Sequence, residues 1–159
     1  MSVEINNNIL KVKSMMKQEA VKALYEIGNE LLNQVQRNTR VDTGQLKNSW
    51  KLVVDESNLT AIVGSPLANA IYEEFGTGEP AHEGKGRKGG WWIKVGNAQN
   101  EISPNVVKKY KWEKVRKDKD GNITFVFTRG KEPTYALTKA FEKVKPKAER
   151  RIAQITKGK

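Results

Sequence analysis

The stretch WKLVVDESNLTAIVG, residues 50–64, contains two β-prone segments separated by a turn. Residues 50–54 and 60–64 are rich in Leu, Val and Ile, and the Asp-Glu-Ser-Asn segment between them has the composition of a turn. This arrangement predicts an antiparallel hairpin. We expect the helices that precede and follow it in the chain to pack against it.

The segment before the hairpin has the periodicity of a long helix. Its apolar residues recur at steps of three or four, the spacing that places side chains on one face of a helix. These residues are Met16, Ala20, Leu24, Ile27, Leu31 and Val35. The pattern predicts a helix over residues 13–39, preceded by a polar, flexible N-terminal arm over residues 1–11.

The segment after the hairpin predicts a short helix and then a long insertion. Apolar positions favour a helix over residues 67–75, with Gly76 available to end it in a left-handed conformation. Six glycines between residues 76 and 90 predict a flexible loop. Trp91-Trp92-Ile93 forms an apolar island, and residues 96–109 have no clear period, so we expect a loop-rich insertion over residues 79–109.

A second hairpin and a final helix are predicted near the C-terminus. Residues 110–115 and 123–128 alternate around an Asp-Gly turn, a strong hairpin signal. Pro133 fits the first turn of a helix, and Pro146 predicts a kink or interruption near Lys143 because it lacks a backbone donor. The order of elements predicts one α+β domain over residues 1–159, with the N- and C-terminal helices packed on an antiparallel sheet.

The predicted core lies between these two long helices and the sheet. Its members come from the apolar faces of both helices: Leu24, Ile27 and Leu31 from the first, and Leu137, Phe141 and Val144 from the second.

Composition excludes several classes of function. The 159 residues include no cysteine and one histidine, His82, which excludes thiol catalysis, cysteine zinc sites and any site that needs two imidazoles. Glu73 and Glu74 are adjacent, so as helical residues they point about 100° apart and do not converge as a catalytic pair. No apolar run approaches the roughly 20 residues that span a bilayer, and no secretory leader is visible. We therefore expect no enzyme, no metal, no cofactor and no membrane span.

The charge of the chain favours anionic partners. It carries 29 Lys and Arg against 18 Asp and Glu, a formal net charge of +11. Seven basic residues lie in residues 108–119, and eight lie between residue 139 and the end. Such an excess of positive charge suits binding to either nucleic acid or an acidic protein surface. The alternative is that the basic residues form solvated faces that keep the protein soluble. A hydrophobic fraction of 37% is lean for this length, which favours burial against partners.

Two basic segments are candidate partner-binding sites. The glycine-rich loop interleaves basic and aromatic residues, a mixture that could clamp phosphates or dock on a protein through tryptophan anchors. We favour the protein dock. The loop residues are Lys85, Arg87, Lys88, Trp91 and Trp92. In the second hairpin, Lys109, Lys111, Lys114 and Arg116 alternate with apolar residues, so we expect several of them to share an exposed face. We single out Lys111 and Lys114 as contacts.

The same loop contains a glycine pattern that could be mistaken for a nucleotide site. Residues 84–89, GKGRKG, match G-x-G-x-x-G. A dinucleotide fingerprint follows a strand directly and opens a helix. Here the string follows EPAHE and leads into two tryptophans, so it does not predict a nucleotide site.

Three segments together resemble one protein family. VDTGQLKNS at residues 41–49, AIYEEFGTG at residues 70–78 and PTYALTKAF at residues 133–141 are similar to the V-D-T-G-x-L-x-x-S, Y-x-x-Y-x-E-F-G-T-G and P-x-x-F-L-x-x-A-x segments of the gene-product-ten-like tail-component family of long-tailed bacteriophages and prophages. The match covers residues 12–78 and 123–155. The third segment departs from the pattern at Tyr135-Ala136-Leu137, and the insertion from residue 79 to 122 is longer than the usual loop.

The resemblance implies a non-enzymatic virion protein of the phage neck. Such a protein would form a ring of six or twelve subunits that joins the capsid connector or head-closure protein to the tail and so completes the tail. It would be assembled in the host cytoplasm. Its neighbours would be connector and tail proteins, with non-specific contact to genomic DNA in the channel. The alternative is a basic nucleic-acid-binding protein.

The family motifs themselves are expected to determine the fold rather than to bind partners. In this interpretation Asp42 caps a helix, Gly44 permits a tight turn, Phe75 packs in the core and Gly76 ends a helix. The residues assigned this role are Asp42, Thr43, Gly44, Glu74, Phe75, Gly76, Thr77 and Gly78.

Overall fold

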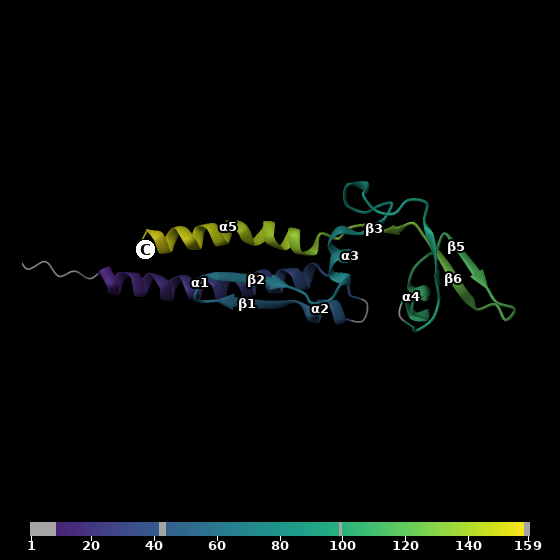
Figure 1. Cartoon of the computed structure of the whole chain (residues 1–159), viewed down its shortest axis with the longest axis horizontal. Helices are drawn as coiled ribbons and strands as arrows, with labels where there is room; N and C mark the ends of the chain where they lie inside the picture. Colours follow the sequence, from purple (N-terminus) through teal and green to yellow (C-terminus); the bar gives the residue numbers. More distant parts are fainter. Residues whose placement is uncertain (1–8, 42–43, 99, 158–159) are drawn as a thin grey trace, which may run out of the picture. The chain divides into compact units, whose positions relative to one another are not determined.

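The computed structural model describes residues 9–41, 44–98 and 100–157 and has the predicted mixed α+β class (Figure 1). Its elements are α1 (Ile9–Asn38), α2 (Gln45–Ser49), β1 (Lys51–Asp55), β2 (Thr60–Gly64), α3 (Asn69–Phe75), β3 (Thr77–Gly78), the 3₁₀ turn η1 (His82–Gly84), β4 (Trp91–Lys94), α4 (Pro104–Lys109), β5 (Lys114–Lys117), β6 (Ile123–Thr128), β7 (Gly130–Lys131) and α5 (Ala136–Thr156). They divide into two compact units. The first holds α1, β1, β2 and α5, and the second holds α3 and all elements from β3 to β7.

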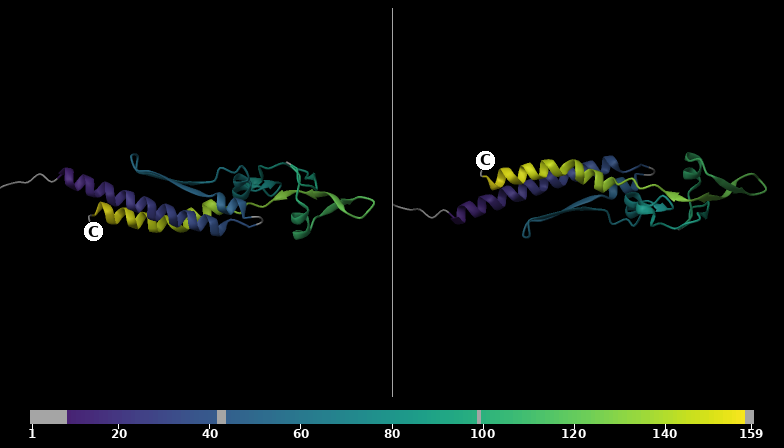
Figure 2. Two further views of the ribbon diagram at one scale, coloured as in Figure 1. Left: turned by 90° about the horizontal axis from the view of Figure 1, so that it is seen from below. Right: turned by 90° about the horizontal axis from the view of Figure 1, so that it is seen from above.

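In the first unit, α1 and α5 run antiparallel along each other (Figure 2). The direction follows from contacts at the two ends: the Asn38 amide donates to the Ala136 carbonyl at 3.0 Å, and the Arg151 guanidinium lies 3.2 Å from Glu19. Lys147 pairs with Glu30 between these ends. Acidic residues of α1 therefore face basic residues of α5, which fixes the direction and register of the pair.

One face of the β1–β2 hairpin packs against α1. The strands pair antiparallel, with Leu52 opposite Val63 and Val53 opposite Ile62. Leu52 and Val63 are half-buried, whereas Val53 and Ile62 are exposed. Because successive side chains of a strand point to opposite faces, the hairpin has an inner face toward α1 and an outer face that carries Val53 and Ile62.

The core of the first unit is made of small residues. Val35 is fully buried, as are Ala136 and Ala140, and Val144 and Trp50 are nearly so. Val144 thus takes its predicted place. Leu24, Ile27, Leu31 and Leu137 are only half-buried, and two predicted apolar-face members, Met16 and Phe141, are exposed. The prediction for Phe141 was wrong because α5 buries its alanines against α1, which turns the neighbouring Phe141 outward.

Both long helices differ from the predicted bounds. α1 begins at Ile9, so residues 9–11 of the predicted arm are helical, while residues 1–8 lie outside the described part. α5 begins at Ala136, so Pro133 precedes the helix instead of lying in its first turn. The helix also continues through Pro146 without interruption, because the packing of α5 along α1 compensates for the single missing hydrogen bond.

The second unit is built on a three-stranded antiparallel sheet in the order β4-β6-β5. The predicted hairpin exists, but its first strand begins at Lys114 rather than at residue 110. The apolar island at Trp91 is the strand β4, which pairs with β6, and residues 104–109 form the helix α4. The prediction of an irregular segment was therefore wrong at these two places. Ser103 caps α4 through its hydroxyl and Pro104 follows at the first helical position.

A second, smaller sheet joins β3 to β7, with Thr77 opposite Lys131 and Gly78 opposite Gly130.

Across residues 9–41, 44–98 and 100–157, no helix is long and apolar enough to span a membrane.

Candidate functional site

One face of the three-stranded sheet combines aromatic and basic side chains. In the register, Trp92 of β4 and Lys114 of β5 both lie opposite Phe127 of the middle strand β6. Lys94 and Arg116 both lie opposite Phe125. Directly opposed residues and residues two apart share a face. We call this surface, made of Trp92, Lys94, Lys114, Arg116, Phe125 and Phe127, the cationic-aromatic face.

The cations of this face lie over its rings. The Arg116 guanidinium is 4.3 Å from the centre of the Trp92 ring, and the Lys114 ammonium is 5.5 Å from the centre of Phe127. Trp92 and Phe127 meet edge to face with ring centres 5.5 Å apart. Because β6 separates β5 from β4, Arg116 reaches across the middle strand to Trp92. Such contacts are worth about 0.5–1 kcal/mol each at exposed sites, enough to favour one side-chain orientation.

Acidic residues neutralise only part of this surface. Lys94 pairs with Glu101 at 2.8 Å, and Arg129, which also lies 5.7 Å from the Phe127 ring, pairs with Glu79 and Glu113, both at 3.1 Å. Within the described residues, Lys114 and Arg116 form no ion pair. Their charges are therefore held in place by aromatic rings and remain available to a partner.

The loop residues predicted to bind together are not gathered on one face. Trp91 and Trp92 are consecutive in β4 and so lie on opposite faces of the sheet. Arg87 lies 5.4 Å from the Trp91 ring, Lys85 pairs with Glu83, and the Lys88 ammonium donates to the Gly84 carbonyl at 2.7 Å. Only Trp92 of the predicted loop cluster joins the cationic-aromatic face.

The basic residues of the predicted second hairpin are also divided. Lys109 ends α4, and Lys111 precedes β5 in a segment outside the strands. Lys114 and Arg116, two residues apart in β5, do share the expected exposed face. We expected several of the four residues to share a face. These two do, and Lys109 and Lys111 do not join them because the strand begins only at Lys114.

A buried carboxylate organises the other end of the second unit. The Glu73 side chain is almost fully buried, accepts from the Arg40 backbone N–H at 3.4 Å and pairs with Lys131. Burial favours the neutral form, but the hydrogen bond and charge of Lys131, together with the Arg40 backbone N–H, outweigh it, so the pKa of Glu73 is lowered from its ordinary 4.5. No local sequence pattern indicates this role, because the partner at residue 131 is distant in the chain.

Among the described family-motif residues, the glycines lie where the backbone has a positive φ. Gly44 and Gly76 have φ of 81° and 71°, and a Cβ on Gly76 would lie 2.4 Å from the Lys131 carbonyl oxygen, so only glycine fits there. Phe75, expected to pack in the core, is 47% exposed, with its ring 5.8 Å from that of His82. Asp42 and Thr43 lie outside the described residues. The remaining residues of this set, Glu74, Thr77 and Gly78, lie in α3 and β3, where Glu74 and Gly78 are buried.

His82 packs against Tyr135. It is half-buried, and its Nδ1 lies 2.8 Å from the Tyr135 hydroxyl, with the two rings edge to face. Among residues 9–41, 44–98 and 100–157, no group of three or more His, Asp or Glu side chains could hold a metal ion.

The outer face of the β1–β2 hairpin is a second exposed surface. Val53 and Ile62, directly opposed, are 63% and 61% exposed. Leu59 in the turn is also exposed. Among the described residues, no further strand pairs with β1 or β2, so each of these strands has a free edge. Exposed apolar side chains beside unpaired strand edges are features of a surface that binds another chain.

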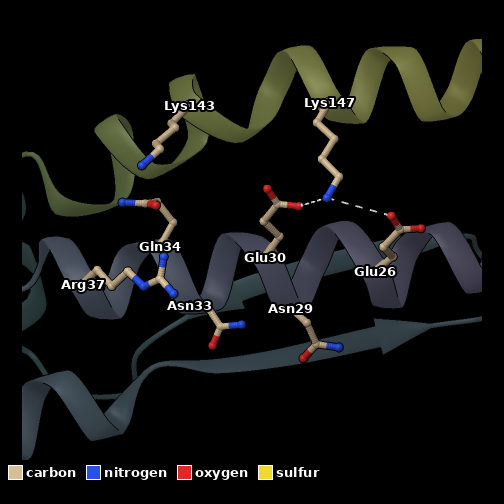
Figure 3. A pocket seen from close by; sticks show the side chains of 8 residues that line it. All are labelled: Glu26, Asn29, Glu30, Asn33, Gln34, Arg37, Lys143 and Lys147. Atoms are coloured by element: carbon tan, nitrogen blue, oxygen red, sulfur yellow. Dashed lines mark hydrogen bonds and ion pairs between the residues drawn. The ribbon is translucent and has the colours of Figure 1, made fainter.

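The groove between α1 and α5 is polar and largely self-neutralised (Figure 3). It has a volume of about 390 Å³, and its lining residues are Glu26, Asn29, Glu30, Asn33, Gln34, Arg37, Lys143 and Lys147. Lys147 bridges Glu30 and Glu26 across it. All of its lining residues have polar or charged side chains, and the Lys147 ion pairs across it help to hold α5 to α1.

Comparison with known proteins relates the chain to one class, the phage tail components. A family described as "Bacteriophage HK97-gp10, putative tail-component" matches residues 4–76. This confirms the resemblance seen in the sequence motifs. The matched segment includes α1, the β1–β2 hairpin and α3, whereas the cationic-aromatic face lies beyond it. No curated protein and no solved structure matches the chain.

Proposed function

We propose that this protein is a non-enzymatic structural subunit of the phage neck that assembles as a ring between the capsid connector and the tail. The match of residues 4–76 to a phage tail-component family carries the proposal. The matched segment contains the β1–β2 hairpin, whose exposed Val53–Ile62 pair and free edges offer a contact between neighbouring subunits. A contact of this kind between unlike surfaces closes into a ring when the rotation between subunits allows it.

The first test is assembly of the purified protein. Light scattering and negative-stain electron microscopy should show closed rings whose population rises with protein concentration. The variant Val53→Lys with Ile62→Lys should remain folded by circular dichroism but lose rings, because charged residues would face the neighbouring subunit. Ile152→Lys, which alters an equally exposed apolar residue of α5, is the control and should retain rings. Monomers at all concentrations of the unaltered protein would contradict the proposal.

The second test concerns position in the virion. Phage particles assembled without this protein should accumulate as separate DNA-filled heads and tails, and adding the purified protein should restore joined particles. Normal joined particles in its absence would exclude a head–tail joining role.

A further inference from the structure

We propose that the cationic-aromatic face binds the phosphodiester backbone of duplex DNA without reading its sequence, and that Arg116 and Lys114 make the phosphate contacts. The inference does not depend on ring formation, because every residue it uses lies in the second unit.

The first observation is that two cations on this face have no acidic partner in the part of the chain that the structure describes. All four residues of β5 are exposed, so the charges of Lys114 and Arg116 reach solvent. The neighbouring carboxylates of Glu79, Glu101 and Glu113 are already paired with Arg129 and Lys94. The face therefore retains positive charge, which an incoming anion could neutralise.

The second observation is the orientation of Arg116. Its guanidinium lies 4.3 Å from the centre of the Trp92 ring. A guanidinium held over an aromatic ring keeps N–H groups at its edge for a phosphate, which it can bind through two parallel hydrogen bonds. The contact with Trp92 thus reduces the side-chain entropy that binding would otherwise cost.

The third observation favours a nucleic-acid backbone over a protein or a stacked single strand. Protein interfaces use aromatic side chains as buried anchors, and single-strand binding proteins stack bases on exposed rings. Here Lys114, Arg116 and Arg129 lie over the rings of Phe127 and Trp92. The face therefore offers charge rather than ring surface. A net charge of +11 on the chain would also speed the encounter with a polyanion.

The test is a DNA-binding titration over a salt series with the full-length protein and a short fluorescent duplex. Fluorescence anisotropy should show that the logarithm of the association constant falls linearly with the logarithm of the salt concentration between about 50 and 200 mM. The variant Lys114→Gln with Arg116→Gln should lower the magnitude of that slope by about 2, one for each phosphate contact removed. Arg116→Lys should keep the slope but weaken binding, because it keeps the charge and loses the guanidinium edge.

The matched control is Lys11→Gln with Lys17→Gln, which removes two exposed charges from α1 in the first unit. It should leave the slope within experimental error of the unaltered protein. Equal losses in the two double variants would show a diffuse charge effect and overturn the proposal. If poly-glutamate displaces the duplex at an equal concentration of negative charges, the partner of the face would be an acidic protein instead of DNA. If a single strand binds more tightly than the duplex and the Trp92→Ala variant loses this tighter binding, the face would bind by base stacking instead.

Discussion

The indole N–H of Trp50 donates a hydrogen bond to the hydroxyl of Thr39 at 2.9 Å. That hydroxyl in turn donates to the Val35 carbonyl at 2.7 Å, and all three residues are buried. The last turn of α1 is thereby fastened to the residue that precedes β1. The hairpin is oriented on α1 by a polar chain as well as by apolar packing.

Thr39→Val should lower the free energy of unfolding by about 1–3 kcal/mol, because it leaves the buried Trp50 N–H without an acceptor. Urea unfolding followed by tryptophan fluorescence measures the change. Thr39→Ser, which keeps the hydroxyl, should cost clearly less. Equal losses in the two variants would show that the methyl group, and not the hydrogen bond, matters.

Two residues of α5 provide a matched test of the core. Val144→Ala should cost roughly 1.5–3 kcal/mol, because Val144 is 4% exposed and its methyl groups lie in the core. Phe141→Ala should change stability by less than about 0.5 kcal/mol, because Phe141 is 55% exposed. Thermal or urea unfolding measures both. A larger loss from Phe141→Ala in the monomer would mean that its ring is packed after all.

Lys131→Met should destabilise the second unit by about 1.5–3 kcal/mol, because it removes a charged hydrogen bond from the buried Glu73 carboxylate. The effect depends on pH. The pKa of Glu73 is lowered from 4.5 in the folded protein, so its contribution to stability is present above about pH 4.5 and is lost as pH falls through the lower folded value.

Unfolding curves of the unaltered protein and the Lys131→Met variant should therefore converge as the pH falls below 4.5. Hydrogen exchange of β3 and β7 amides would localise the effect to the second unit. A constant difference in stability across this pH range would contradict the role of the Glu73–Lys131 pair.

The turn of the β1–β2 hairpin should contain a carboxyl group with an unusually low pKa, that of Asp55. Hydrogen bonds from the Ser57 and Asn58 side chains and from their backbone N–H groups lower the pKa of Asp55 from 3.8 to about 2. Stability from this turn is present above about pH 4 and is lost as pH falls through about 2. An NMR titration of the Asp55 carboxyl carbon should show the low pKa directly. Ser57→Ala should raise it toward 3.8, and an unchanged value would exclude the Ser57 hydrogen bond.

Local sequence patterns accounted for much of the architecture. The three-to-four spacing from Met16 to Val35 predicted α1, and the alternating segments around residues 55–58 predicted the hairpin, because both patterns depend only on near neighbours in the chain. Ser103-Pro104 also carried a local helix-start signal for α4, which the absence of a longer periodicity obscured. The family motifs were likewise visible in the chain, and the match over residues 4–76 covers the first of them and most of the second.

What the sequence determined by itself was the class of fold, the main elements, the excess of positive charge and the resemblance to a family of phage tail components, since each follows from composition or from short-range order. Only the tertiary structure decided which residues meet. Trp91-Trp92 became a strand because β6, some thirty residues later in the chain, supplies its hydrogen-bonding edge. Phe141 turned outward because α5 buries Ala140 against α1. The stacking of Arg116 on Trp92 and the burial of Glu73 beside Lys131 join residues far apart in the chain, and their physical cause is strand pairing and long-range packing that no local pattern encodes.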